Sequence, residues 1–346
     1  MMHRTLILTV VLILLTAGLT ACAKEDIPEE LSFELTLENE AVETAVEGAA
    51  LWLFAVDDGE DDLALSSETA GEIRMARMNT AGALTSEWVT VADSTDVDGQ
   101  RIADHSHLYS EGYHWIVFSV TSAKESYLLK LDKNFERVFL KKLATEGPTN
   151  DMFAVAGEDG LYIGHFLPGT GHTIYQVDSD GNMVDTFPIG GGKFKHSNGA
   201  SVVPSKDGFS VFAGETLNFR VQGALMRLDY TNAWAEAKST TLVDEEDTNI
   251  NMTSAVQWND LWIVTARMTS SQSGSGSDSG SALQKDGGQI WRFVFDESGK
   301  ELKREVLYNG DEGNRPHMEL KDTLLITTWD VAGESMIRME AVTEVY

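Results

Sequence analysis

The chain has 346 residues, of which 55 are Asp or Glu and 26 are Lys or Arg, so its formal net charge is −29. A surface this negative repels phosphate backbones, which argues against nucleic acid as a partner. The hydrophobic content of 42 % is that of an ordinary globular protein, and the length allows one large core or two modest ones. The single cysteine excludes an internal disulfide, so packing alone must stabilise the fold.

The first residues combine a basic start with an apolar run. His3 and Arg4 precede the segment from Leu6 to Ala17, which is too short to span a membrane as a lasting anchor. The run is followed by Leu19-Thr20-Ala21-Cys22, in which small residues precede the cysteine. This pattern resembles the lipobox of bacterial lipoproteins. The alternative is an ordinary secretory signal with an incidental cysteine.

The lipobox resemblance implies cleavage between Ala21 and Cys22 and lipidation of Cys22. Residues 1–21 would then be the signal peptide, 22–30 a lipidated tether and 31–346 the folded domain. Lipid would hold that domain at a membrane surface of the cell envelope. Because Ala23 rather than aspartate follows the cysteine, the family's sorting rule favours the outer over the inner membrane in cells with two membranes.

After residue 40 the chain repeats a strand pattern with two landmarks. The first is a turn containing Gly, Asp or Asn followed by an apolar, aromatic-rich strand. Its copies are Leu51 to Phe54, Trp115 to Phe118, Leu161 to Ile163, Phe209 to Phe212, Leu261 to Val264 and Leu324 to Ile326. On these strands Trp52, Trp115 and Trp262 are interpreted as packing residues.

The second landmark is a strand that ends in an apolar residue, a second residue that is usually long and polar, another apolar residue and then an acid or amide. Its copies are Ala76 to Asn79, Leu129 to Asp132, Tyr175 to Asp178, Met226 to Asp229, Phe293 to Asp296 and Ile337 to Glu340. Two landmarks in fixed order, six times, predict an all-β chain of four-stranded antiparallel sheets.

The body of the chain therefore resembles a six-bladed β-propeller, an architecture that protects sheet edges by radial repetition. The sixth unit stops at Tyr346 with most of its fourth strand missing. Near the other end, Leu31, Phe33, Leu35 and Leu37 alternate with polar residues. We expect this strand to pair with the last blade and close the ring.

Long connections between the second and third strands of the units are expected on one face, at residues 57–70, 166–173, 214–223 and the Ser/Gly-rich stretch 269–288. Either this last stretch is functional or it is an insertion without a role.

Polar residues also gather where the innermost strands begin. The candidates for a binding or metal site at the mouth of the channel are His105, His107, Asp151, His196, Asn198, Asn251 and His317. Imidazole, carboxylate and amide groups from several blades would suit a divalent cation or a proton donor. The alternative is that they merely line a water-filled channel.

The sequence is consistent with two functions. The first is a membrane-anchored, non-catalytic binding module for a small ligand, a surface polymer or an envelope protein, with no required cofactor. The alternative is a lactonase-like hydrolase that depends on a divalent metal, with His107, Asp151, Asn198, Asn251 and His317 around the ion. No nucleophile elbow, phosphate loop or zinc motif is present in the sequence.

Overall fold

A computed structural model describes residues 34–37, 41–120, 125–143, 150–157, 159–167, 171–189, 199–215, 223–245, 248–270 and 288–345. The chain divides into a small unit, residues 1–38 and 342–346, and a large unit, residues 39–341. Regular structure in the described part is almost entirely β-strand, with one 3₁₀ turn, η1 (Ser94–Val97). No helix there is long and apolar enough to cross a membrane.

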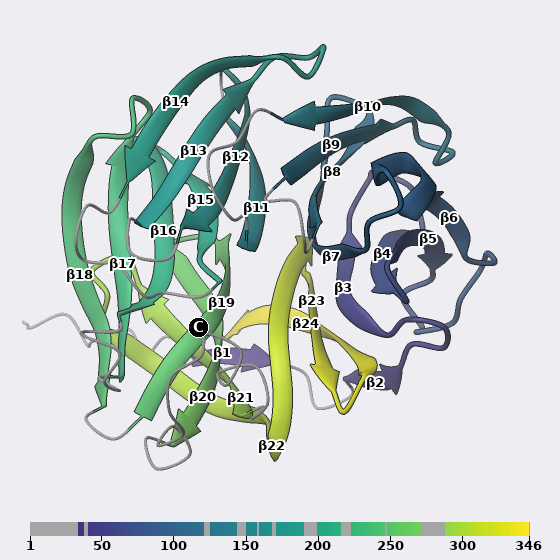
Figure 1. Ribbon diagram of the computed structural model, residues 1–346. Helices are drawn as coiled ribbons and strands as arrows, with labels where there is room; N and C mark the ends of the chain where they lie inside the picture. The colour runs from purple at the N-terminus through teal and green to yellow at the C-terminus, as the bar shows by residue number, and fades with distance from the viewer. Residues whose placement is uncertain are drawn as a thin grey trace, which may run out of the picture. The chain divides into compact units, whose positions relative to one another are not determined.

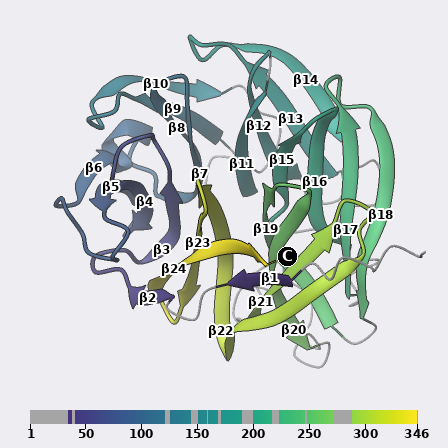
Figure 2. The ribbon, with the colours of Figure 1, turned by 180° about the vertical axis from the view of Figure 1, so that it is seen from behind.

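Four sheets of the large unit are separate, and each has four antiparallel strands in sequential order (Figures 1 and 2). The first contains β3 (Leu51–Val56), β4 (Leu63–Thr69), β5 (Glu72–Met78) and β6 (Val89–Ala92). The second contains β7 (Ile102–Ser110), β8 (Tyr113–Val120), β9 (Glu125–Leu131) and β10 (Arg137–Leu143). The third contains β11 (Asn150–Gly157), β12 (Gly160–Leu167), β13 (Gly171–Val177) and β14 (Met183–Ile189). The fourth contains β15 (Ser201–Ser205), β16 (Gly208–Glu215), β17 (Gly223–Thr231) and β18 (Glu236–Glu245).

The remaining strands form one eight-stranded sheet. In the large unit it contains β19 (Thr248–Trp258), β20 (Leu261–Ser270), β21 (Gly288–Asp296), β22 (Glu301–Lys321) and β23 (Leu324–Val331). It ends in β24 (Glu334–Val345). The long strand β22 has two partners, because its residues up to Gly313 pair with β21 and those from Gly313 onward pair with β23.

Both N-terminal strands pair with β24. In the small unit, β1 (Glu34–Leu37) pairs antiparallel with the stretch from Val342 to Val345. In the large unit, β2 (Val42–Ala45) pairs with the stretch from Met336 to Met339. The alternation of residues 31–37 predicted a pairing with the last sheet, and Glu34–Leu37 makes it. The sequence did not indicate β2, which is only four residues long.

The second landmark lies on β5, β9, β13 and β17, each the third strand of a separate sheet, and on β21 and β24 of the eight-stranded sheet. The first landmark lies on the second strand of the second, third and fourth sheets and on β20 and β23 of the eight-stranded sheet, but the first sheet differs. Leu51 to Phe54 belongs to β3, the first strand of its sheet, and the second strand is β4. The expected long loop at 57–70 is therefore wrong, since β4 occupies Leu63–Thr69. Its sequence, LALSSET, ends in polar residues and lacks the aromatic signal of the other copies.

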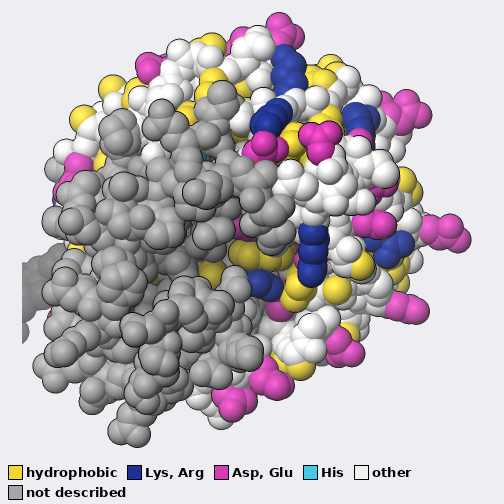
Figure 3. Space-filling view, in the orientation of Figure 1, with side chains coloured by type: hydrophobic (Ala, Val, Ile, Leu, Met, Phe, Trp, Pro, Cys, Tyr) yellow, Lys and Arg dark blue, Asp and Glu magenta, His cyan; other side chains and the backbone are white. Residues whose placement is uncertain are grey.

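The apolar core lies between sheets. One buried cluster combines Ile73 of the first sheet with Ile116 of the second. Similar clusters join the second sheet to the third, the third to the fourth, and the fourth to the eight-stranded sheet. A further cluster combines Leu53 of the first sheet with Ile326 of the last. Figure 3 shows Asp and Glu side chains scattered over the described part of one face rather than gathered in a single patch.

Candidate functional site

A cavity of about 460 Å³ lies among strands of all five sheets. Its wall contains residues of β3, β7, β11, β19 and β22, together with residues 199–204 at β15. This volume is in the range of pockets that hold small molecules. All these residues belong to the large unit, so the cavity is formed within one compact body.

Breaks in strand register shape the rim of the cavity. The pairing skips residues between Leu51 and Phe54 in β3, between Asn251 and Ser254 in β19, and between Asn314 and His317 in β22. At these bulges Trp52, Met252 and Arg315 have φ of 53°, 48° and 48°. Positive φ is unfavourable for such residues, and bulges redirect the side chains that follow them.

Gly199 has φ of 65° at the entrance to β15. A Cβ at this position would lie 2.9 Å from the Cα of Met252, so only glycine allows this close approach. The carbonyl oxygen of Gly199 accepts the backbone N–H of Thr253 at 2.8 Å.

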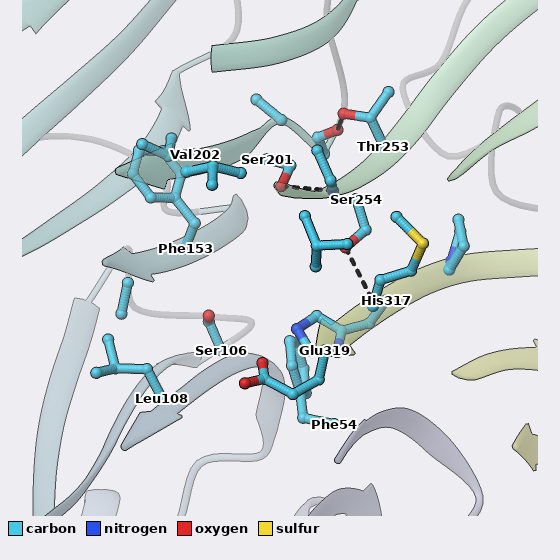
Figure 4. A pocket seen from close by; sticks show the side chains of 18 of the residues that line it. Phe54, Ser106, Leu108, Phe153, Ser201, Val202, Thr253, Ser254, His317 and Glu319 are labelled. Atoms are coloured by element: carbon cyan, nitrogen blue, oxygen red, sulfur yellow. Dashed lines mark hydrogen bonds between the residues drawn. The ribbon is translucent and has the colours of Figure 1, made fainter. Parts of the chain in front are cut away.

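Five strands each point one side chain at the cavity, and these side chains occupy equivalent positions in their strands. Each position lies four residues before the last paired residue of its hairpin, and Figure 4 labels all of these residues. They are Ser106, Phe153, Ser201, Ser254 and His317. The sequence prediction groups His317 with His107, which is one residue away from Ser106 in β7. Because neighbouring residues of a strand face opposite sides, counting from each hairpin would have found the three serines.

Two of these serines are oriented by backbone groups of another strand of the cavity wall. The Ser201 hydroxyl oxygen accepts the N–H of Ala255 at 3.0 Å, and the Ser254 oxygen accepts the N–H of Met318 at 2.8 Å (Figure 4). Each hydroxyl therefore keeps its own hydrogen for donation. The two hydroxyls are therefore preformed donors in the cavity wall.

His107 is part of the cavity wall and begins a buried polar chain. Its Nε2 lies 3.1 Å from Nδ1 of His114, whose Nε2 lies 3.4 Å from Oδ2 of Asp58. Arg77 donates to the same Asp58 oxygen at 2.7 Å. Burial alone would raise the pKa of Asp58, but hydrogen bonds from His114 and Arg77 hold it below its usual range.

Asp58 ends this chain. A carboxylate only accepts, so Nε2 of His114 faces it as the donor. Burial and the neighbouring His114 and His105 lower the pKa of His107 well below 6.5, so its imidazole is neutral at neutral pH.

Two other titratable groups at the cavity, His317 and Glu319, are neutral as well. Burial lowers the pKa of His317 to about 4. Burial and the negative charge of Asp57 raise the pKa of Glu319 to about 8, so its carboxyl is mostly protonated at pH 7. Figure 4 shows Glu319 and His317 projecting from the same strand into the cavity.

His105 lies behind the cavity wall. Its Nε2 is 3.0 Å from the Ser66 hydroxyl, and its ring packs edge-on against Phe54, with centroids 4.9 Å apart. Burial, with a smaller effect of His317, lowers its pKa to about 3. Phe54 also packs against His317, at 4.5 Å between centroids.

Asn251 is bound to a buried arginine and not to the cavity. Arg267, 2 % exposed, donates to Asn251 Oδ1 and to Asn314 Oδ1, both at 2.8 Å. This arrangement ties the start of β19 to the part of β22 that pairs with β23.

The remaining predicted residues stay predictions. Asp151 lies in β11, but its side chain is outside the described part of the structure, as are Cys22, His196 and Asn198. Among the described residues, no three His, Cys, Asp or Glu side chains gather in a way that would hold a metal ion. The metal hypothesis depends on Asp151 and Asn198, so it is not tested.

The sequence matches no protein-family model and no curated protein. Among solved structures, it resembles a member of the DUF4221 family from Bacteroides vulgatus, with a TM-score of 0.52 and 10 % identity over 90 % of this chain and 99 % of that one. A Bacteroides ovatus family-43 glycoside hydrolase from a xyloglucan utilisation locus has a TM-score of 0.46 at 8 % identity, covering 82 % of this chain and 64 % of that one. A family-43 β-1,3-galactosidase has a TM-score of 0.47 at 9 % identity, covering 73 % and 92 %.

The fold is a β-propeller. Its four-stranded antiparallel sheets and its likeness in fold to the DUF4221 protein support this architecture. At these identities the likeness extends to the fold and not to activity.

Proposed function

We propose that this protein is a lipid-anchored envelope protein whose propeller binds a small ligand in the central cavity. The observation that carries the proposal is the lining of the 460 Å³ cavity, where preformed hydroxyl donors and neutral titratable groups stand beside aromatic side chains. Pockets for small molecules combine an apolar wall with a few oriented polar groups in this way.

The proposal includes a closed ring of six blades. The two pairing halves of β22 divide the eight-stranded sheet into two blades, which join the four separate sheets. In this arrangement β2 is the outer strand of the last blade. The presence of Leu53 and Ile326 in one buried cluster supports closure between the first and last blades.

Ligand binding can be tested by filling the cavity. Ser106 points its side chain at the cavity, and Ser106→Phe would occupy part of the volume. We expect small molecules that co-purify with the protein to appear in native mass spectrometry of the wild type and to disappear in Ser106→Phe. A bound ligand should also raise the melting temperature of the wild type only. If ligands raise the melting temperatures of both proteins equally, the cavity is not the binding site.

Anchoring is tested separately. Cys22→Ser should leave the domain folded but release it from the membrane fraction, since lipid on Cys22 is the proposed anchor. A variant that still sediments with membranes after a high-salt wash would contradict the lipoprotein assignment.

A further inference from the structure

Arg315 is a nearly buried cation whose hydrogen-bonding capacity is poorly used. It belongs to the cavity wall, and its side chain is 15 % exposed. The ion pair from its NH1 to Asp330 Oδ2 is long, at 3.5 Å, and its Nε has no hydrogen-bond partner in the described part of the structure. A guanidinium has five N–H donors, so within the described part of the structure most of this capacity has no partner.

Other buried arginines of the large unit are better satisfied. Arg267 donates to two amide oxygens at 2.8 Å. Arg292, 1 % exposed, donates to Glu305 at 2.9 and 2.7 Å and also to Glu340. These contacts are those expected of a buried charge, whose isolation from water is costly unless it is paired.

Asp330 already has partners of its own. Its Oδ2 accepts the backbone N–H of Trp52 at 3.1 Å, and its Oδ1 accepts the hydroxyl of Ser335 at 2.9 Å. Asp330 therefore fixes the Trp52 backbone, and its contact with the Arg315 guanidinium is long, at 3.5 Å. The guanidinium carbon instead lies 4.2 Å from the centroid of the Trp52 ring, which holds it by a cation–π contact.

The backbone positions both partners at the same rim. Trp52 and Arg315 each have positive φ at a bulge, an arrangement that costs free energy and often marks functional sites. Among the described residues of the cavity wall, the titratable groups of His107, His317 and Glu319 are neutral at neutral pH, so they do not compensate this positive charge.

We propose that Arg315 binds the carboxylate of a small ligand whose apolar body lies against Phe54, Leu108 and Phe153. This inference rests on the proposed ligand-binding function of the cavity. The planar guanidinium suits a carboxylate because it donates two parallel hydrogen bonds. Trp52 keeps the guanidinium plane fixed, and the apolar residues belong to the same cavity wall.

Benzoate and benzamide form a matched pair of probes, since they share size and ring but only benzoate carries a charge. Their dissociation constants are measured by titration calorimetry or ligand-observed NMR at pH 7. We expect the wild type to bind benzoate at least tenfold more tightly than benzamide. Arg315→Gln should abolish this preference and leave benzamide binding within twofold of the wild type. Arg304→Gln, an exposed site on the same strand, is the control and should behave as the wild type.

Arg315→Lys provides a second measurement if Arg315→Gln folds poorly. It keeps the charge but loses the paired donors, so benzoate should weaken several-fold relative to benzamide. Wild-type protein that binds benzamide as well as benzoate would overturn the carboxylate inference and leave the cavity's binding function intact. Failure to bind either probe would overturn both.

Discussion

The ammonium of Lys130 on β9 donates to the backbone carbonyl oxygen of Ser179, 3.0 Å away in the turn before β14. It thereby joins the second and third sheets. The ammonium also lies over the rings of Tyr113 and Trp115, 4.0 and 4.4 Å from their centroids. Lys130 is the long polar residue of the second landmark, and Ser179 directly follows the aspartate of the next copy.

The same contact recurs between other sheets. Arg77 donates to the carbonyl oxygen of Lys133 at 2.8 Å, and Arg227 donates to that of Glu297 at 3.0 Å. Lys133 and Glu297 also directly follow a landmark aspartate. These aspartates accept backbone N–H groups within their own turns, as Asp132 does from Asn134 at 2.8 Å. The second landmark therefore connects one sheet to a turn of the neighbouring sheet by a hydrogen bond.

Lys130→Met should destabilise the protein by about 2 kcal/mol, because it removes a charged hydrogen bond and a cation–π contact while keeping most of the apolar stem. Lys238→Met, at an exposed position of β18, should change stability by less than about 0.5 kcal/mol. Urea denaturation of both variants measures the difference. Equal midpoints would show that the contact between sheets contributes nothing.

Asp58→Asn should destabilise the fold by about 3 kcal/mol, because it leaves His114 and Arg77 without their buried carboxylate. The neighbouring Asp61 is exposed, so Asp61→Asn is the matched control with little expected effect. Thermal and chemical denaturation give the comparison. A loss confined to Asp61→Asn, or none in either variant, would contradict the role assigned to the polar chain.

The pKa of Glu319 predicts a pH dependence with a definite sign. Folding raises this pKa to about 8, so between its ordinary value and pH 8 the folded state holds more protons than the unfolded state. The stability that Glu319 contributes is therefore present at low pH and falls as the pH rises toward 8, by at most ~1.4 kcal/mol per pH unit. Glu319→Gln should lack this decline. The check is the difference in melting temperature between wild type and variant from pH 5 to 9, and a constant difference would refute the assignment.

His317 titrates in the opposite sense. Its pKa falls to about 4 on folding, so the unfolded state binds more protons between that value and about 6.5. Wild-type stability should consequently drop as the pH falls through this window. His317→Gln should drop less over the same window in parallel thermal scans. A steeper loss in the variant would contradict the neutral, buried state of His317.

Sequence patterns predicted the sheets but located the cavity less well. The landmarks recur in every unit because hairpin turns and buried strands impose local residue preferences. Which side chains face the cavity depends on register, and bulges such as that at Arg315 change register without a distinct sequence signal. His317 was among the candidates, whereas Ser106, Ser201 and Ser254 were not, because the candidates were taken from the polar starts of the strands and not counted from each hairpin. The buried chain from His107 to Asp58 depends on contacts between sheets, which no local pattern reports.

Stepwise N-terminal truncation tests how the ends of the chain stabilise the last sheet. Removing Ala23 to Pro28 should leave the melting temperature unchanged, because this stretch is polar tether in the proposed organisation. Removing residues through Leu37 deletes β1 and leaves the end of β24 unpaired, so a moderate loss is expected. Removing residues through Ala45 also deletes β2, whose Val42 packs against the cluster that contains Leu53 and Ile326. This last truncation should cause the largest loss, because it exposes both a strand edge and apolar surface. All proteins start from the Cys22→Ser form, so that lipid does not affect the comparison. Equal melting temperatures across the series would refute the proposed closure of the ring by the N-terminal strands.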